Sequence, residues 1–411
     1  MRILIVGHGA REHATARRLA EEHNDIFAFS TKPNLGLEKI CTAIHQAPSY
    51  NVQEITQYAH IIQANIVVAA NEQPLFDGLG EYLRENNILC FGPDSELARL
   101  ELDKNYAKSI VTTLFPALSI PSYNVGSLVD ARKVIDSIGL PIVIKTNTFS
   151  AGKAIKIVDE PSELDTVLKS FTQDHNSLQI EPYLSGKCVH VYCFTDGKTR
   201  LTTNTVLEYA FKEGNKEIKT GGMGSVSSPQ QLQYLSNADT RIISDFYNVV
   251  LPYVQNVSNK PYQGTLVGQF IKTEDRLFFN EFDVRFGDPE FINVIESLDM
   301  SLTEVLFSIA NQELSAIRMK EVAVVSICHV PPGYPADPKP HSFKLDEIFF
   351  DHLQIYWGNA SKEGDTVRTG TSRTLVAVGI DRTIDAARQQ ALDLSHKINA
   401  GLCFREDIGL L

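Results

Sequence analysis

The residues with the clearest capacity for chemistry lie in the stretch 280–290, where acidic side chains follow the apolar run 277–279. Glu281 and Asp283 are two residues apart, so on a strand their side chains share one face while Phe282 points to the other. Two converging carboxylates repel each other unless a cation lies between them. We therefore expect a hard divalent ion such as Mg2+ together with phosphate oxygens. A solvated strand end is the alternative.

A glycine-rich turn, Gly7-His8-Gly9, lies between the buried-strand pattern 2–6 and a helix pattern over about 11–22. Glycines let backbone N–H groups and a helix N-terminus approach an anion, so this turn can bind a phosphate. A nicotinamide dinucleotide is disfavoured, because Glu12 takes the place of a third glycine and Ser30, not an acid, follows the next strand. A purely structural turn is the alternative.

Lysines and a second group of glycines extend this pattern. Lys145 ends an apolar strand and Lys153 lies in a small-residue loop, while Lys104 and Lys108 share a helix face at a spacing of four. The turn at 220–224 reads TGGMG, and its backbone amides can lie over a transferring group. Lysines, amides and Mg2+ together can neutralise the phosphates of a nucleotide. Each lysine taken alone is more simply a solvated surface residue.

The composition is that of an ordinary globular protein of 411 residues with a formal net charge of −12. This charge disfavours nucleic-acid binding, which needs an excess of Lys and Arg on one face. The six cysteines form no C-x-x-C pair, so neither a disulfide framework nor a structural zinc site is indicated. Because no signal peptide or membrane-spanning run is recognised, we expect a cytoplasmic protein.

The order of strand and helix patterns predicts a multidomain protein of mixed α/β and α+β class. Three units are expected: an N-terminal α/β domain at 1–100, a second domain at 101–320 with a lid subdomain at about 122–190, and a C-terminal α+β domain at 321–411. The first unit should contain a parallel sheet with strands at 2–6, 26–29, 66–69 and 88–91. A single helix is expected over 96–113.

The order of these motifs resembles that of the ATP-grasp ligases and, among them, the glycinamide ribonucleotide synthetases. The matching segments span nearly the whole chain, at 7–14, 72–75, 91–93, 144–153, 220–224, 281–290 and 403–409. The resemblance implies a parallel-sheet domain, an ATP-grasp domain and a small C-terminal domain. It also implies a ligase that joins glycine to 5-phosphoribosylamine through a glycyl phosphate, using ATP and Mg2+ or Mn2+. Such an enzyme would be a monomer acting on small molecules, with neither nucleic acid nor membrane as a partner.

The resemblance also implies roles for individual residues. The lysines that would hold ATP phosphates are Lys104, Lys145 and Lys153. The hinge against adenine would contain Glu181, Tyr183 and Leu184. The metal ligands would be Glu281 and Asp283. The residues acting on the amino acid or the transition state would be Arg285, Asp288, Gly222 and Gly224. The residues facing the sugar phosphate would be Gly9, Arg11, Glu12, Asn34 and Glu72.

The chain departs from the family pattern in two segments of interest. The acidic pair expected after the hinge reads Lys187-Cys188, so the carboxylate expected on the ATP ribose is missing, and the expected basic segment is replaced near 208–211. Two alternatives therefore stay open: a paralogous ATP-grasp ligase with another amine or acid, and a non-catalytic nucleotide-binding protein. Retention of Lys145, Glu281 and Arg285 favours catalysis.

Overall fold

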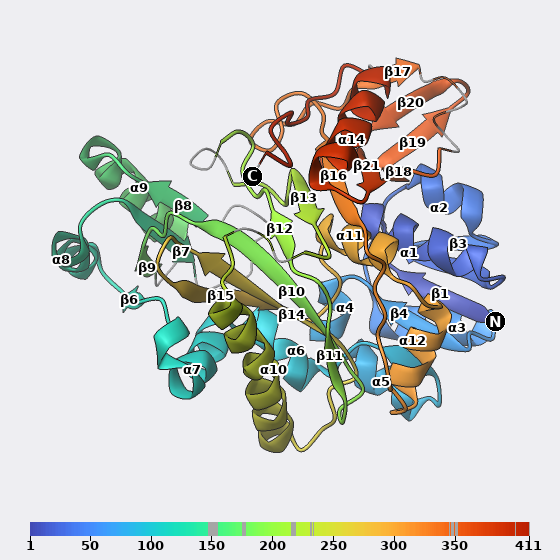
Figure 1. Cartoon of the computed structure of the whole chain (residues 1–411), viewed down its shortest axis with the longest axis horizontal. Helices are drawn as coiled ribbons and strands as arrows, with labels where there is room; N and C mark the ends of the chain where they lie inside the picture. The colour runs from blue at the N-terminus through green and yellow to red at the C-terminus, as the bar shows by residue number, and fades with distance from the viewer. Residues whose placement is uncertain are drawn as a thin grey trace.

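The computed structural model describes residues 1–411 except 147–154, 175–177, 215–218, 231, 233, 345, 347–348, 350–351, 399 and 411. The chain begins with a parallel sheet in the order β3-β2-β1-β4-β5 (Figure 1). Its strands are β1 (Arg2–Val6), β2 (Asp25–Ser30), β3 (Ala43–Gln46), β4 (Ile66–Ala69) and β5 (Leu89–Phe91). The helices of this unit are α1 (Ala10–Glu21), α2 (Leu35–Ile40), α3 (Val52–Ile61), α4 (Glu72–Phe76) and α5 (Leu79–Glu85). The expected parallel sheet is confirmed.

Two details of this region differ from the sequence-based expectation. The edge strand β3 was not expected, because its residues are half-exposed and carry no apolar run. The single helix expected over 96–113 is wrong: α6 (Ser95–Leu102) and α7 (Lys104–Leu114) are separate helices. Asp103 has an extended backbone between them, and its carboxylate accepts a hydrogen bond from the backbone N–H of Tyr106, which caps α7. This break fixes where Lys104 begins the second helix.

A small antiparallel sheet in the order β6-β9-β7-β8 forms the lid, at the left of Figure 1. Its strands are β6 (Tyr123–Val125), β7 (Ile142–Thr146), β8 (Ile155–Val158) and β9 (Leu178–Pro182), and its helices are α8 (Leu128–Ile138) and α9 (Pro161–Asp174). The lid has an apolar core of its own, in which Ile135, Ile142 and Ile180 are almost fully buried. A separate core is the physical requirement for a subdomain that moves as one body.

The largest sheet has nine strands in the order β15-β14-β10-β12-β13-β16-β21-β18, with β11 paired to β10 (Figure 1). Its strands are β10 (Lys187–Thr195), β11 (Arg200–Thr202), β12 (Val206–Glu208), β13 (Gly224–Ser227), β14 (Gly264–Lys272), β15 (Leu277–Asp283), β16 (Ala323–His329), β18 (Ile355–Trp357) and β21 (Leu375–Asp381). Because β13 pairs with β16, hydrogen bonds of this sheet cross residue 321. The domain limits remain a prediction.

The other elements complete this architecture. In the part of the chain that the structure describes, the further helices are the 3-10 helix η1 (Pro116–Leu118) and the α-helices α10 (Asn237–Ser258), α11 (Glu290–Ser297), α12 (Leu302–Ala310) and α14 (Ile384–Ile398). A three-stranded sheet near the C-terminus contains β17 (Ser342–Lys344), β19 (Ala360–Glu363) and β20 (Thr366–Thr369). Among the described helices, none is both long and apolar enough to cross a lipid bilayer.

A bulge in β15 directs the acidic side chains to one face of the main sheet. Phe279 pairs with Phe270 and Glu281 with Gln269, so Asn280 is an extra residue and reverses the alternation. Phe279 and Phe282 therefore both pack beneath α10, where the Phe282 ring lies 5.7 Å from the ring of Phe246. Glu281 points to the opposite face, as the two-residue spacing predicts.

We predict that Phe246→Ala strongly destabilises the protein. Phe246 is fully buried and its ring contacts those of Phe270, Phe279 and Phe282. Removing such a core ring costs about 3–5 kcal/mol. Urea unfolding followed by tryptophan fluorescence should give a clearly lower midpoint. Val249→Ala on the same helix, where the side chain is 41% exposed, is the matched control and should change stability by less than about 1 kcal/mol. Equal midpoints for the two variants would contradict this account of the core.

Candidate functional site

The carboxylate of Glu281 lies among lysines that come from different elements. Lys104 Nζ, at the start of α7, is 2.9 Å from Glu281 Oε2, and Lys219 Nζ is 3.9 Å from Oε1. Burial acts to raise the pKa of Glu281, but Lys104, Lys219 and Lys145 outweigh it and hold the pKa below its ordinary value. Glu281 is therefore a carboxylate anion in this structure.

A second ion-pair group joins α7 to the lid. Lys145 Nζ on β7 is 2.6 Å from Glu181 Oε2 on β9, and Lys108 of α7 contacts the other oxygen of the same carboxylate. Burial lowers the pKa of Lys145 well below its ordinary value, and the neighbouring Lys108 and Lys104 lower it further. For Lys108, burial lowers the pKa to about 8. Two partly desolvated lysine amines thus share one carboxylate.

The remaining predicted nucleotide contacts fall at the edge of this group. Tyr183 and Leu184 are half-buried in the short connection between β9 and β10, which joins the lid to the main sheet. The backbone N–H of Tyr183 donates to the carbonyl of Pro141, so the connection is anchored to the lid. Lys153 lies outside the described residues. The roles of these residues toward a nucleotide remain predictions.

Asp283 lies on the same face of β15 as Glu281 but has different partners. Its Oδ2 accepts a hydrogen bond of 2.9 Å from Gln269 Nε2, and its Oδ1 lies 3.5 Å from Arg285 Nη2. Gln269 is in register with both Glu281 on β15 and His190 on β10. The strand pattern therefore brings the two acids to one face, while the two carboxylates are neutralised by different cations.

Arg285 is the centre of a buried charge cluster that we name the arginine cluster: Arg285, Glu72, Glu101, Asp283 and Arg11. Arg285 Nε is 3.2 Å from Glu72 Oε2, and its Nη2 is 3.1 Å from Glu101 Oε1. Burial acts to raise the pKa of Glu72, but the guanidinium groups of Arg285 and Arg11 hold it below its ordinary value. Glu101 differs, because burial raises its pKa to about 8. Sequence reasoning missed Glu101, which carries no motif signal in α6.

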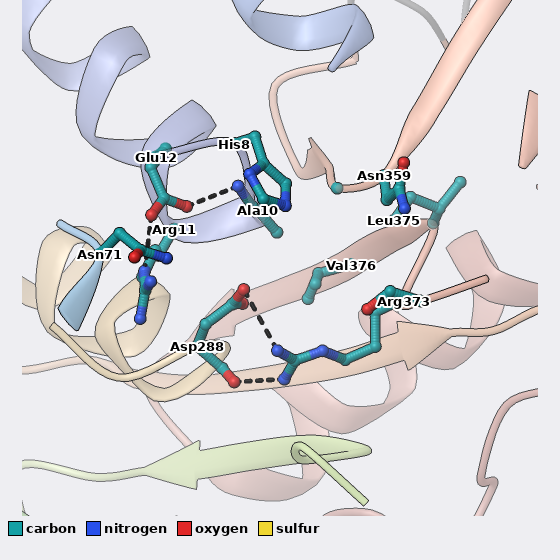
Figure 2. A pocket seen from close by; sticks show the side chains of 13 residues that line it. His8, Ala10, Arg11, Glu12, Asn71, Asp288, Asn359, Arg373, Leu375 and Val376 are labelled. Carbon is teal, nitrogen blue, oxygen red and sulfur yellow. Dashed lines mark hydrogen bonds and ion pairs between the residues drawn. The ribbon is translucent and has the colours of Figure 1, made fainter. Parts of the chain in front are cut away.

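The first glycine turn holds its charged residues tightly. The backbone N–H of Gly9 donates to Glu12 Oε2 at 2.6 Å, and Arg11 Nε donates to Glu12 Oε1 at 2.8 Å (Figure 2). Arg11 Nη1 also donates to the backbone carbonyl of Phe286, 275 residues away. Asn34 is hydrogen-bonded to the turn, since its side-chain amide donates to the backbone carbonyls of His8 and Gly9. The structure thus uses Asn34 to position the turn.

A cavity of about 140 Å³ opens between this turn, the 288 loop and β21 (Figure 2). Asp288 and Arg373 both line the cavity and form an ion pair, with 3.3 Å between Asp288 Oδ2 and Arg373 Nη2. The other carboxylate oxygen, Oδ1, is buried and has no hydrogen-bond partner among the described residues. A Cβ atom at Gly9 would lie 2.6 Å from Asp288 Oδ2, so a larger residue there would require the Asp288 side chain to move. No sequence motif marks Arg373, which follows a turn 85 residues after Asp288.

The second glycine turn contacts Arg373, which lines the same cavity. Gly222 has a φ of +100°, and a Cβ there would lie 2.8 Å from Pro289 Cδ. Gly224 begins β13, where a Cβ would collide with the carbonyl oxygen of Ser326. Arg373 Nη1 donates to the backbone carbonyls of Gly221 and Asp288, which ties this turn to the 288 loop. One arginine therefore holds both predicted catalytic loops, although the roles of the glycines remain predictions.

Matches to known sequences identify the family. Residues 1–101 match the family model described as phosphoribosylglycinamide synthetase, N domain, and residues 102–291 match that of the ATP-grasp (A) domain of the same synthetase. The chain is 29% identical over 419 residues to the phosphoribosylamine–glycine ligase of Methanosarcina acetivorans, covering 100% of this chain and 94% of the relative. The ligase of Thermococcus gammatolerans is 29% identical over 420 residues, with the same two shares covered.

Solved structures share the fold. A phosphoribosylamine–glycine ligase from Thermotoga maritima has a TM-score of 0.81 at 21% identity, covering 99% of this chain and 100% of that chain. The biotin carboxylase domain of the Hydrogenobacter thermophilus 2-oxoglutarate carboxylase, solved with MgADP, has a TM-score of 0.73 at 15% identity, covering 98% and 92%. The expected fold class is thereby confirmed. Since the two family models together match residues 1–291 without a gap, the chain belongs to the phosphoribosylglycinamide synthetase family.

Proposed function

We propose that this chain is an ATP-grasp carbon–nitrogen ligase that joins glycine to 5-phosphoribosylamine, giving glycinamide ribonucleotide, ADP and phosphate in purine biosynthesis. One observation carries the proposal: Lys104 of α7 pairs with Glu281 on β15, and Lys145 of the lid, which pairs with Glu181, also acts on the charge of Glu281. Lysines close to carboxylates are what a metal–nucleotide requires, because the lysines bind phosphate oxygens and the carboxylates bind the metal. The curated relatives bear this activity in their names.

The donor set at β15 fits Mg2+. Glu281 and Asp283 present carboxylate oxygens on one face of the strand, and the surrounding lysines keep Glu281 ionised. These two residues would hold the ion, and bound Mg2+ with ATP would supply the phosphoryl group and neutralise part of its charge. Lys104, Lys108 and Lys145 are already oriented toward this space by Glu281 and Glu181, so they bind phosphate oxygens with little reorganisation.

The cavity beside the metal face takes the two smaller substrates. Arg285 acts on the glycine carboxylate and on the oxyanion formed when the amine attacks the glycyl phosphate, whereas Asp288 acts on the ammonium group of glycine. Arg373 holds the 288 loop in place. Gly9, Arg11, Glu12, Asn34 and Glu72 shape the wall toward the sugar phosphate. The lid, which contains β7 and β9, excludes water, because an acyl phosphate exposed to solvent would hydrolyse before the amine attacks. We further propose a cytoplasmic monomer, in keeping with six free cysteines.

A paralogous ligase is the second candidate, and a specific observation favours it. Cys188 and Glu208 form, with His190, a buried group at the place where the resemblance predicts the ribose carboxylate and a basic segment. The lysines and the β15 acids that would serve phosphoryl transfer are retained. A change confined to the nucleotide or acceptor region therefore fits a different choice of substrate better than a loss of phosphoryl transfer.

The test of the proposed function is ADP release with Mg2+–ATP and phosphoribosylamine generated in place, with and without glycine. Glycine-dependent release together with glycinamide ribonucleotide detected by mass spectrometry supports the purine ligase. Release that requires a different amino acid or amine supports the paralogue. Binding of Mg2+–ATP without release under any acceptor supports a non-catalytic protein and overturns the proposal.

We predict that Glu281→Gln reduces turnover by about 10²-fold or more while the fold is kept. The amide keeps the shape of the side chain but removes the negative charge that faces Lys104 and the proposed metal. The readout is kcat for ADP release beside the far-ultraviolet circular dichroism spectrum. Asp275→Asn, in the exposed turn between β14 and β15, is the control and should retain wild-type turnover. Near-native turnover in Glu281→Gln would remove Glu281 from the metal site.

We predict that Arg373→Lys lowers kcat/KM for the amine acceptor by about 10-fold or more. The guanidinium contacts the Asp288 carboxylate and two backbone carbonyls at once, and a lysine ammonium cannot reproduce that planar arrangement. Arg368→Lys on β20, whose side chain is 61% exposed, is the matched control. Identical kinetics in the two variants would show that the loop does not depend on Arg373.

We predict that nucleotide binding takes up protons above pH 8. In the free protein, burial lowers the pKa of Lys108 to about 8 and also lowers that of Lys145. Because bound phosphates favour the charged form of these lysines, the lysines take up protons from the solution when the nucleotide binds. Affinity for Mg2+–ADP should therefore fall as the pH rises above about 8. The proton uptake is measured by isothermal titration calorimetry in buffers of different ionisation enthalpy. The pH is set to about 8.5, roughly half a unit above the pKa of Lys108. Lys108→Met should reduce the proton uptake, and a binding enthalpy independent of buffer would refute the prediction.

A further inference from the structure

Three metal-binding side chains meet on the face of the main sheet that carries Glu281. Cys188 and His190 are two residues apart on β10, so their side chains share this face, and Glu208 on β12 is paired directly with Cys188. His190 Nε2 lies 3.6 Å from Cys188 Sγ and 3.0 Å from Glu208 Oε2. The three donor atoms all lie within 4.8 Å of one another. In the part of the chain that the structure describes, no other His, Cys, Asp and Glu residues form such a group.

The chemistry of this donor set points to one class of ion. A thiolate and an imidazole are ligands of borderline and soft cations, whereas Mg2+ selects oxygen donors. Thiolate, imidazole and carboxylate together form a ligand set typical of Zn2+, and three protein ligands leave a fourth position for water or substrate. We propose that Cys188, His190 and Glu208 bind a divalent transition-metal ion, with Zn2+ the best match, at a site separate from Glu281 and Asp283.

A second observation supports a ligand at this place. Glu290, at the start of α11, is 3% exposed, and its Oε1 is buried without a hydrogen-bond partner among the described residues. Its charge interacts with those of both His190 and Glu208. A buried carboxylate oxygen without a partner costs free energy, which a metal ion or a metal-bound water would recover. Lys219 also faces the cluster, but its ammonium is shared with Glu281.

The location of the cluster agrees with the departures in the sequence. Cys188 stands where the family resemblance predicts a carboxylate, and Glu208 lies in the segment that replaces the expected basic residues. Both departures therefore contribute a donor to one point on the sheet. The sequence alone does not indicate a zinc site, because Glu208 lies 18 residues after His190 on another strand and no C-x-x-C pair is present.

The test uses the full chain without nucleotide or substrates, so its outcome is independent of the proposed ligase activity. After removal of bound metal by a chelator, the protein is titrated with Co2+ and then with Zn2+. We expect one Co2+ per chain with an intense thiolate-to-cobalt absorption in the near ultraviolet, which Zn2+ abolishes. Oxygen-only binding at Glu281 and Asp283 cannot give that absorption, so Glu281→Gln should retain it.

Variants separate metal binding from a hydrogen-bonded triad. Cys188→Ser should lose the absorption and weaken Zn2+ binding by about 10²-fold or more, and Glu208→Gln, which keeps the shape of the side chain, should weaken binding by about 10-fold or more. Cys403→Ser, at an exposed cysteine, is the control and should behave as wild type. Zn2+ should also raise the melting temperature of the wild type but not that of Glu208→Gln. Absence of the thiolate absorption in the wild type, or Zn2+ affinity unchanged in Glu208→Gln, would overturn the proposal.

Discussion

The partial burial of Arg285, whose side chain is 16% exposed, is the constraint on which the arrangement of the site depends. A guanidinium group taken out of water must be surrounded by carboxylates, because an unpaired buried charge costs several kcal/mol. Its partners come from three separate segments: Glu72 at the start of α4, Glu101 in α6 and Asp283 at the end of β15. The N-terminal unit, the connecting helices and the main sheet are therefore held in one relative position at the place where the cavity opens.

The same principle organises the neighbouring groups. Glu281 and Glu181 each hold lysines from different elements, so the cations are oriented before any ligand arrives. In a partly desolvated site such preformed electrostatics act more strongly than they would in water. Arg373 plays a comparable part for the loops, since it contacts the carbonyls of both Gly221 and Asp288. The balance of positive and negative groups suits an anionic nucleotide with a divalent cation.

Much of this architecture follows from local sequence patterns. The parallel strands are short apolar runs, and the alternation at Glu281, Phe282 and Asp283 predicts which side chains share a face. The sequence could not predict contacts between distant segments, nor the places where a side chain caps a helix and so interrupts a helical pattern. Glu101 and Arg373 carry no motif and enter the site through tertiary packing, and Asp103 divides a continuous helical pattern because its side chain caps the second helix. The Cys188–His190–Glu208 group likewise depends on strand pairing.

Transfer of an oxygen atom from glycine to phosphate would show directly that a glycyl phosphate forms. In the proposed reaction a glycine carboxylate oxygen attacks the terminal phosphorus of ATP, and the amine then displaces phosphate from the acyl carbon. With glycine labelled with 18O in its carboxylate, the account predicts phosphate that carries one labelled oxygen and an amide product that carries the other. Unlabelled phosphate released together with the amide, or ATP cleavage that does not depend on glycine, would contradict it.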